Sequence, residues 1–350
     1  MRIKNSANIA GRTINADNPT YVVAEIGVNH NGDPQLAHRM VDAAKAAGAD
    51  AVKFQTYRTA DLVLDSAQRA KYQEAAIGLG TQEQMLSKLE LPFEVFAEIK
   101  THCEEANIDF MSTAFDPISL EFVVSLKPVC LKWPSGELTN LPLMRQARQS
   151  RLPIILSTGM ATIREIAAAV ETIGSNNDIV ILQCVSNYPA RIEDQNFRVL
   201  PALASTFGVP VGLSDHTVGP YAAIAARALG MSVLEKHFTL DRGMVGPDHS
   251  SSIEPVDFKN MVNILRQIEV GLGDGIKGPL AVELDVKSTA RKSMVFAKNL
   301  KKGHRLTEGD FWFKRPGVGV PPNDLERYLG RVLSRDVEVN SLFESTDVNS

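Results

Sequence analysis

Two lysines in apolar surroundings are the first residues of the sequence that suggest chemistry. Lys53 and Lys132 each stand within a short hydrophobic run, VKFQ and CLKW. An ammonium group is costly to bury unless it meets an opposite charge or takes part in chemistry. We therefore interpret both lysines as parts of a site for phosphate or carboxylate groups. A structural ion pair with Glu25 or Glu137 is the alternative.

Two histidines suggest a cation site. His216 and His237 each follow an apolar run, in GLSDH and LEKH. Two imidazoles, a carboxylate from Asp248 or Glu25, and water form a ligand set that suits Mn²⁺, Fe²⁺, Co²⁺ or Zn²⁺. Such a cation would polarise a carbonyl group as a Lewis acid. Hydrogen-bonded core histidines are the alternative interpretation.

Eight short apolar runs predict the strands that position these groups. The runs are hydrophobic throughout, which is typical of parallel strands buried on both faces. They cover residues 21–26, 51–55, 109–112, 129–132, 153–157, 179–184, 210–213 and 233–237. Helical patterns alternate with them, at 34–47, 93–106, 162–173, 221–229 and 256–271, and more weakly at 118–126 and 141–149. This alternation predicts an α/β fold, a (β/α)₈ TIM barrel, with a doubly wound open sheet as the alternative.

A barrel places its active site at the C-terminal ends of the strands, so polar residues are expected there. The sequence has them after every run: Glu25, Asn29, His30, Lys53, Gln55, Ser112, Thr113, Asp116, Lys132, Ser135, Glu137, Ser157, Thr158, Ser186, Asn187, Tyr188, Ser214, Asp215, His216, Glu235, Lys236, His237, Asp248 and His249. Hydroxyl groups at Thr113, Ser135 and Ser214 could complete an anion site. Single serines at strand ends also serve as helix caps.

The chain also shows a domain boundary and an unusually long connection. Residues 57–92 exceed the usual length of a βα loop, which predicts a functional lid or an added helical hairpin. The stretch GLGDGIKGP reads as a glycine-rich linker. We expect a barrel domain over residues 1–275, a linker over 276–287 and a small domain of short strands over 288–350.

Composition limits the classes of function. The 350 residues carry a net charge of −4 with a pI near 6.0, so no general basic field would gather nucleic acid or an anionic membrane. The sequence has no signal-peptide pattern and no apolar run near the roughly 20 residues that span a bilayer. Three scattered cysteines, Cys103, Cys130 and Cys184, fit a reducing compartment and read as buried small apolar residues. We expect a cytoplasmic location.

Several motifs together resemble one family, the sialic acid synthases. The motifs are AEIGVNHNGD, VKFQTY, STAFD, LKWPSGELTNLPLM, ILSTGMAT, GLSDHT, EKHFTLDR, GPDHSSS and KRPGVG. The resemblance runs in order from about residue 20 to the C-terminus. It implies a transferase that condenses phosphoenolpyruvate (PEP) with an N-acetylated hexosamine and releases phosphate. It also implies a barrel that uses Mn²⁺ (or Mg²⁺ or Co²⁺), a C-terminal antifreeze-like (SAF) domain, and a domain-swapped homodimer.

The same resemblance implies roles for individual residues. PEP would contact Lys53, Thr113, Lys132, Ser135, Ser186 and Ser214; the sugar would face Glu25, Gln55, Tyr188, Asp248 and, from the partner chain, Arg315; and the metal would bind His216 and His237. Glu25, Glu137 and Lys132 are the candidate catalytic residues, with either glutamate as general base. The sequence departs from the usual family pattern at Pro134, which stiffens a turn, and at Ser186, where asparagine is common.

Alternatives remain open for the substrate and for the class of protein. The acceptor N-acetylmannosamine would give N-acetylneuraminate, and 2,4-diacetamido-2,4,6-trideoxymannose would give N,N'-diacetyllegionaminate. A metal-independent Schiff-base aldolase would use Lys132 or Lys53 as its nucleophile. A noncatalytic sugar-binding or ice-binding protein would act through the small domain and would need neither Lys53 nor His216.

Overall fold

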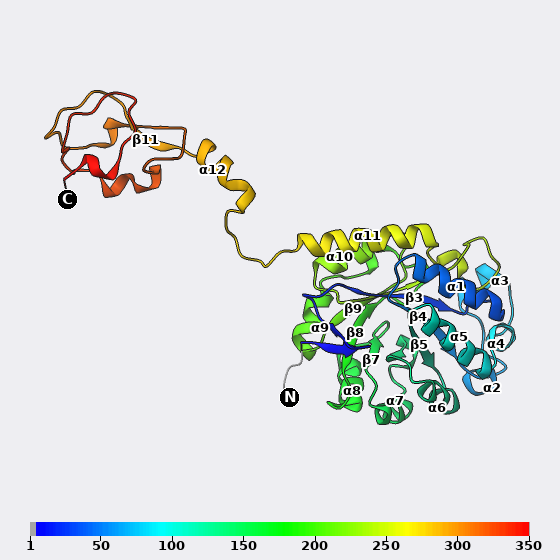
Figure 1. Cartoon of the computed structure of the whole chain (residues 1–350). Coiled ribbons are helices and arrows are strands. Elements are labelled where there is room, and N and C mark those ends of the chain that lie inside the picture. Colours follow the sequence, from blue (N-terminus) through cyan, green and yellow to red (C-terminus); the bar gives the residue numbers. More distant parts are fainter. Residues whose placement is uncertain (1–4, 350) are drawn as a thin grey trace. The chain divides into compact units, whose positions relative to one another are not determined.

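A computed structural model describes residues 5–349 of the chain, which divide into two compact units after Gly273 (Figure 1). In the first unit eight parallel strands close into a barrel in the order β10-β3-β4-β5-β6-β7-β8-β9. Helices surround this barrel (Figure 1). The prediction of a TIM barrel is thus confirmed, and the open sheet is excluded because β10 pairs with β3.

The barrel strands lie where the apolar runs predict them. They are β3 (Tyr21–Gly27), β4 (Ala51–Thr56), β5 (Asp109–Ala114), β6 (Leu131–Trp133), β7 (Ile154–Ser157), β8 (Ile179–Cys184), β9 (Val211–Asp215) and β10 (Val233–His237). Two of the eight have the predicted bounds, and the others differ by one or two residues at one end or at both. Such differences are expected, because hydrogen bonding and hydrophobicity need not end at the same residue.

Eight helices follow the barrel strands along the chain. They are α1 (Pro34–Ala46), α5 (Phe93–Glu105), α6 (Pro117–Ser125), α7 (Leu141–Ala147), α8 (Ile163–Ile173), α9 (Val199–Phe207), α10 (Tyr221–Ala228) and α11 (Pro255–Gly271). The sequence patterns did not predict α9, which contains Pro201. The helix begins at Val199, so this proline lies in the first turn, where a missing N–H group is tolerated.

A short hairpin forms before the barrel, in a stretch that reads as mostly polar. β1 (Ala7–Ile9) and β2 (Arg12–Ile14) are antiparallel, and positive φ angles at Ala10 and Gly11 make the tight turn between them. Its apolar residues are buried in one cluster with residues at the N-terminal ends of the barrel strands, including Tyr21. The hairpin therefore closes the barrel at the end opposite the predicted site.

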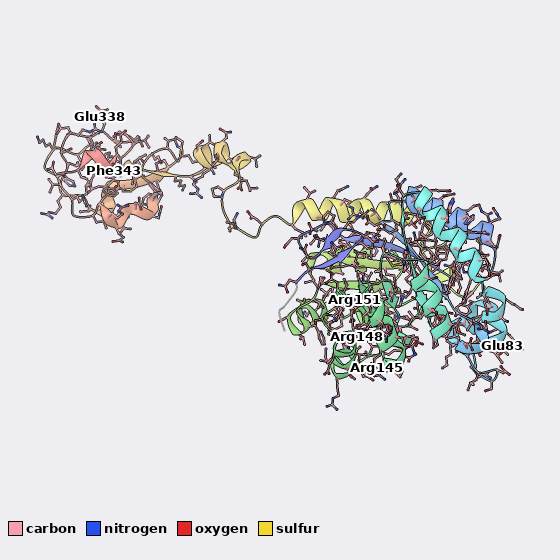
Figure 2. All side chains as sticks on the ribbon, turned by 60° about the horizontal axis from the view of Figure 1, so that its bottom comes forward. Glu83, Arg145, Arg148, Arg151, Glu338 and Phe343 are labelled. Carbon is pink, nitrogen blue, oxygen red and sulfur yellow. The ribbon has the colours of Figure 1, made fainter. Side chains whose placement is uncertain are left out.

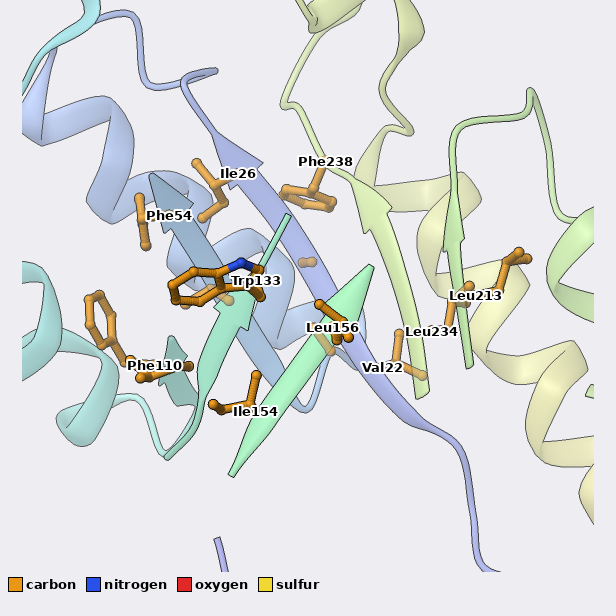
Figure 3. Close-up of a cluster of buried hydrophobic side chains, with 14 of the residues drawn as sticks. Val22, Ile26, Phe54, Phe110, Trp133, Ile154, Leu156, Leu213, Leu234 and Phe238 are labelled. Atoms are coloured by element: carbon orange, nitrogen blue, oxygen red, sulfur yellow. The ribbon is translucent and has the colours of Figure 1, made fainter. Parts of the chain in front are cut away.

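The strands are buried on both faces, which explains their continuous hydrophobic runs. Leu234 belongs to the large cluster between the strands and the helices (Figure 3), whereas Val233 belongs to the cluster inside the barrel. Because side chains alternate along a strand, Glu235 and His237 share the interior side with Val233. The same alternation holds in β3 and β4. The interior is thus apolar near the strand starts and polar near their ends.

The long connection after β4 is helical. It contains α2 (Thr59–Leu62), α3 (Lys71–Ile77) and α4 (Gln82–Leu89), which is one helix more than the predicted hairpin. Met85 and Leu89 of α4 pack with Tyr57 and Val28 in a small cluster of their own. This cluster joins the connection to the loop that follows β3.

The second unit has its own core. It contains α12 (Leu284–Ala290), which begins within the predicted linker, and the antiparallel pair β11 (Ser293–Phe296) and β12 (Phe311–Lys314). The core consists mainly of large apolar side chains, among them Phe296, Phe311 and Phe343, the last labelled in Figure 2. Among residues 5–349, none of the helices has the length and hydrophobicity needed to cross a membrane.

Candidate active site

A cavity of about 290 Å³ lies at the C-terminal ends of the barrel strands. It is lined by Glu25, Lys53, Gln55, Tyr72, Lys132, Pro134, Ser135, Gly136, Ser157, Met160, Cys184, Ser186, Tyr188, Ser214, His216, Glu235 and His237. Ten of these are residues to which the sequence resemblance gives a role: Glu25, Lys53, Gln55, Lys132, Ser135, Ser186, Tyr188, Ser214, His216 and His237. The structure thus brings both lysines and both histidines to one cavity.

Buried charges form a connected cluster on the cavity wall. Lys53 Nζ lies 2.7 Å from Glu25 Oε2 and 3.9 Å from Glu235 Oε2, and Lys132 Nζ lies 3.4 Å from Glu235 Oε1. Ser214 Oγ donates a hydrogen bond to Glu235 Oε1 over 2.9 Å, and Gln55 Nε2 donates to Glu25 Oε1 over 3.1 Å. The ion pair between Lys53 and Glu25 that was the alternative interpretation exists, but its members also line the cavity.

The cluster shifts the pKa values of its members in different directions. Burial raises the pKa of Glu25 in spite of the neighbouring ammonium of Lys53. Burial acts on Glu235 in the same direction, but Lys132 and Lys53 outweigh it and bring the pKa of Glu235 to about 2. Burial lowers the pKa of Lys132. The surroundings thus make Glu235 the more acidic of the two carboxylates that face the lysines.

Small groups leave room for an anion beside Lys132. Ser135, in the short helical turn η1 (Ser135–Glu137), accepts a hydrogen bond from the Gly159 amide over 2.8 Å. A Cβ atom added to Gly159 would stand 2.2 Å from Ser186 Oγ and 2.8 Å from Ser135 Oγ. The glycine therefore keeps open the space in front of two hydroxyl groups. Hydroxyl and ammonium donors around such a space suit a phosphate or carboxylate.

The two histidines lie next to each other on the cavity wall, with ring centroids 5.4 Å apart and ring planes inclined by 66°. His216 Nδ1 donates to the Val185 carbonyl over 2.8 Å, which leaves Nε2 with its lone pair. His237 Nδ1 is buried, has no hydrogen-bond partner among the described residues, and lies 3.8 Å from Asp248 Oδ2. Burial holds the pKa of His237 well below its usual range. A neutral, unpartnered imidazole is a suitable metal ligand.

The residues fit a divalent cation only with help from other ligands. Within residues 5–349, no group of three or more His, Cys, Asp or Glu side chains is arranged to hold a metal. The chain therefore offers two imidazoles, and water or substrate oxygen atoms would have to complete the coordination.

Aromatic rings form the wall beside the histidines. The Tyr188 ring centroid lies 4.0 Å from that of His216 and 5.4 Å from that of His237. Tyr72, from α3 of the long connection, packs on Tyr188 at 5.0 Å. The connection after β4 thus contributes a side chain to the cavity, as expected of a lid. The length of this connection was the only feature of the sequence that indicated a lid, and it did not identify Tyr72.

Four predicted site residues lie outside the cavity lining. Thr113 lies behind Lys53, whose Nζ donates to Thr113 Oγ1 over 3.4 Å. The Glu137 carboxylate accepts from Asn140 Nδ2 over 2.7 Å, so it is held within its own loop. Asp248 is buried beside His237, and Arg315 belongs to the second unit, where it is exposed. Of the two candidate general bases, only Glu25 lines the cavity.

Some polar residues at strand ends have structural roles instead. Lys236 and Asp215 form an ion pair of 2.7 Å on the side of the strands that faces the helices, because they alternate with the cavity residues. Asp116 caps α6 by accepting from the Ser119 amide over 2.8 Å. Ser112 is buried and bonds to Thr56 over 2.8 Å. These contacts explain why polar residues stand at these strand ends without a catalytic role.

Two further residues of the cavity lining had no role in the sequence interpretation. Glu235 was noted at a strand end without a role, although strand alternation from His237 could have placed it in the cavity. Cys184 was interpreted as a small apolar core residue. It is buried, but it also lines the cavity, with Sγ 3.9 Å from His216 Nδ1.

Comparisons with known proteins agree with this architecture. The NeuB family model matches residues 40–277, and a SAF domain model matches residues 291–347. The chain is 40% identical over 92% of its length to the N,N'-diacetyllegionaminic acid synthase of Legionella pneumophila, of which it covers 92%. It is 34% identical over 95% of its length to a pseudaminic acid synthase of Campylobacter jejuni, of which it covers 98%.

A solved structure extends the likeness to three dimensions. The N-acetylneuraminic acid synthetase of Leptospira borgpetersenii, in complex with citrate, aligns with a TM-score of 0.71 and 32% identity, over 80% of this chain and 94% of that one. The family model covers more than half of the chain, and the relatives match nearly all of it. The predicted resemblance is confirmed: the chain belongs to the NeuB family and carries a C-terminal SAF domain.

Proposed function

We propose that the protein is a nonulosonate synthase that condenses PEP with an N-acetylated hexosamine and releases phosphate. The observation that supports this most is the convergence of Lys53, Lys132, His216 and His237 on one cavity in a chain of the NeuB family. The positive groups suit an enol phosphate. The paired imidazoles suit a cation beside an aldehyde.

The PEP end of the cavity is where the lysines and hydroxyl groups lie. Lys53 and Lys132 would pair with the phosphate and carboxylate groups, while Glu235 keeps both ammonium groups in place. Ser135 and Ser186 would add hydrogen bonds at the space that Gly159 leaves open. Local positive charge of this kind binds an anion although the whole chain is acidic.

The sugar would bind beside the histidines, next to Gln55, Tyr188 and Asp248. Held there by His216 and His237, Mn²⁺ would act as a Lewis acid on the aldehyde group. The terminal carbon of PEP then forms a bond to the aldehyde carbon, and water adds to the central carbon of PEP. Cleavage of the C–O bond of the resulting intermediate releases phosphate and leaves the keto acid.

Glu25 is the residue that we propose as general base toward this water. It lines the cavity, and burial raises its pKa, which makes the carboxylate a better proton acceptor. Gln55 and Lys53 hold its two oxygen atoms in one orientation. Positioning both substrates in this enclosed space supplies the entropic part of the rate enhancement.

The acceptor sugar is tested by direct comparison. N-acetylmannosamine and 2,4-diacetamido-2,4,6-trideoxymannose are each incubated with PEP, Mn²⁺ and the protein, and phosphate release is measured. The similarity to N,N'-diacetyllegionaminic acid synthases supports the second sugar, and we expect the higher kcat/KM with it. Phosphate release with neither sugar would contradict the proposed substrate class.

One observation favours a second candidate reaction. Burial lowers the pKa of Lys132, as in lysines that form Schiff bases. In an aldolase of this kind, borohydride would trap the substrate covalently on Lys132. Chelators would not affect its turnover. The condensation predicts no trapping and loss of turnover with EDTA. The noncatalytic alternative is disfavoured by the named synthases among the relatives.

We also propose that Arg315 completes the sugar site of a second copy in a homodimer. Arg315 is exposed and lies within the SAF domain. If it acts across the dimer, His216→Ala and Arg315→Ala chains, each inactive alone, restore activity when coexpressed, because one of the two sites then has both residues. Lack of activity in the mixture, with dimers shown by ultracentrifugation, would contradict the crossed arrangement.

A further inference from the structure

The loop after β3 makes contacts that the proposed chemistry does not use. This loop carries Asn29, His30 and Asn31, and it faces the loop between β10 and α11. The second loop contains Asp248 and the short helical turn η4 (His249–Ser251). Two separate sets of hydrogen bonds join the two loops.

The first set runs through Asn29. Its Nδ2 donates to Ser252 Oγ over 2.9 Å and to the Phe238 carbonyl over 2.9 Å. Ser252 Oγ in turn donates to the backbone carbonyl of Asp248 over 2.7 Å. Asn29 therefore holds the backbone of Asp248 through one serine.

The second set runs through Asn31 and His249. Asn31 Nδ2 donates to the Val245 carbonyl over 3.0 Å, so its Oδ1 is free to accept from His249 Nε2, which lies 3.1 Å away. The other ring nitrogen, Nδ1, lies 2.7 Å from Thr239 Oγ1. Burial lowers the pKa of His249, which favours the neutral ring with its proton on Nε2. His249 is completely buried.

Gly246 packs directly against this second set. A Cβ atom at Gly246 would stand 2.5 Å from His249 Cδ2 and 2.8 Å from Asn31 Oδ1. Any side chain at this position would therefore push His249 and Asn31 apart. The glycine in GPDHSSS is thus explained, because the backbone of Gly246 passes too close to the hydrogen bond between His249 and Asn31 to leave room for a side chain.

We propose that Asn29 and Asn31 are positioning residues that fix Asp248 at the active site by clamping the loop after β10. The clamp consists of Asn29, Asn31, Gly246, His249 and Ser252. Within the clamp, Asn31 holds His249, the residue after Asp248. Asn29 holds the backbone carbonyl of Asp248 through Ser252. The Asp248 carboxylate is thereby kept 3.8 Å from His237 Nδ1, on the sugar side of the cavity. This last role rests on the proposed function.

Hydrogen exchange on the full chain without substrate tests the clamp itself. Asn31→Gly removes the side chain without strain, since Asn31 has a φ of 53°. Gly246→Ala keeps every hydrogen-bonding group but displaces them. We expect both variants to speed hydrogen exchange of the amides in residues 241–252 about tenfold. A change of this size corresponds to the loss of roughly one buried hydrogen bond. Unchanged exchange in both would overturn the clamp.

Two further variants distinguish hydrogen bonding from packing. His249→Gln can still donate to Asn31 and accept from Thr239, whereas His249→Leu can do neither. We expect slow exchange in the first and fast exchange in the second. Ser250→Ala changes an exposed side chain of the same loop and serves as the matched control. Equal exchange in the glutamine and leucine variants would contradict the assigned bonds.

Kinetics then test whether the clamp acts on Asp248. Asn31→Gly and Gly246→Ala should raise the KM of the acceptor sugar about tenfold and leave the KM of PEP unchanged. Equal increases for both substrates would indicate general loosening and overturn the positioning role. If the unmodified protein releases no phosphate with any sugar, the proposed function fails, while the exchange result still decides the clamp.

Discussion

Two buried carboxylate sites, one in each unit of the molecule, handle charge in opposite ways. In the second unit Asp310 is completely buried, with Oδ1 paired to Lys298 Nζ at 2.8 Å. Its Oδ2 accepts from His304 Nε2 at 2.9 Å and from the amide and hydroxyl groups of Thr307 at 2.8 and 2.9 Å. Each oxygen thus has a partner, although Oδ1 makes only the ion pair and no hydrogen bond among the described residues.

The cavity cluster of the barrel is less completely paired. His237 Nδ1 and Ser157 Oγ are buried without hydrogen-bond partners among the described residues. Burial raises the pKa of Glu25, and burial with the charge of Glu25 raises that of Asp248 to about 6. The pKa of Asp310 is well below its usual range instead, because its ion pair and hydrogen bonds outweigh burial. Unpaired polar groups beside a cavity are typical of a site that binds a ligand, whereas the carboxylate of Asp310 is stabilised by its ion pair and hydrogen bonds.

The largest effect on turnover is expected from Lys132→Met. The substitution keeps the length of the side chain and removes one of the two cations that face the anion. We expect kcat/KM for PEP to fall about a thousandfold, as for the loss of a strong charge-stabilising donor. Phosphate release with saturating sugar measures it. A fall of less than tenfold would place Lys132 among structural ion pairs.

A smaller effect is expected from Gly159→Ala, which leaves all charges in place. The new Cβ would fill the space before Ser135 and Ser186. We expect the KM of PEP to rise about a hundredfold, the equivalent of losing two hydrogen bonds to a charged group. Gly271→Ala, at the end of α11 where a Cβ meets no atom within 4 Å, is the control. A normal KM in Gly159→Ala would argue against an anion at this place.

Tyr72→Ala should affect only the acceptor sugar. The ring packs on Tyr188 beside the histidines, and aromatic contacts of this kind contribute about 1 kcal/mol. We expect the KM of the sugar to rise about fivefold, with the KM of PEP unchanged and with near-normal values in Tyr72→Phe. Steady-state kinetics with each substrate varied in turn decides the point. An unchanged KM of the sugar in Tyr72→Ala would show that the connection after β4 has no role in sugar binding.

Asp310→Asn should leave turnover at 25 °C unchanged and alter stability. A carboxylate with a lowered pKa in the folded state adds stability above its unfolded pKa of about 3.9, and this stability is lost as the pH falls through lower values. Thermal unfolding at pH 3 to 7 should therefore show a lower Tm for the variant at neutral pH and a smaller difference near pH 3. Parallel Tm curves for the two proteins would contradict the assigned pKa direction.

The sequence was sufficient for the barrel and for many of the residues that line the candidate cavity. Strands buried on both faces leave continuous apolar runs, so all eight strands could be located. Lys53 and Lys132 stood out because charge within such a run needs a reason. The hairpin over Ala7–Ile14 could not be predicted in this way, since only three of its residues face the core.

The partners of each side chain could not be read from the sequence. Lys53 pairs with Glu25 as expected, but Glu235 also lies near both lysines, because β9 and β10 bring Ser214 and Glu235 into register. Glu137 is held by Asn140 in its own loop, a contact that depends on the local turn. Tyr72 reaches the cavity because α3 folds over it.

The sequence by itself determined which side chains stand at the strand ends, since hydrophobic periodicity fixes the strands and alternation fixes the face. Only the tertiary structure decided which of them meet. Closure of the barrel sets β10 beside β3 and β3 beside β4, with His237 opposite Glu25 and Glu25 opposite Lys53. Residues more than 180 positions apart thus share one low-dielectric cavity, where proximity rather than residue type determines their charge and chemistry.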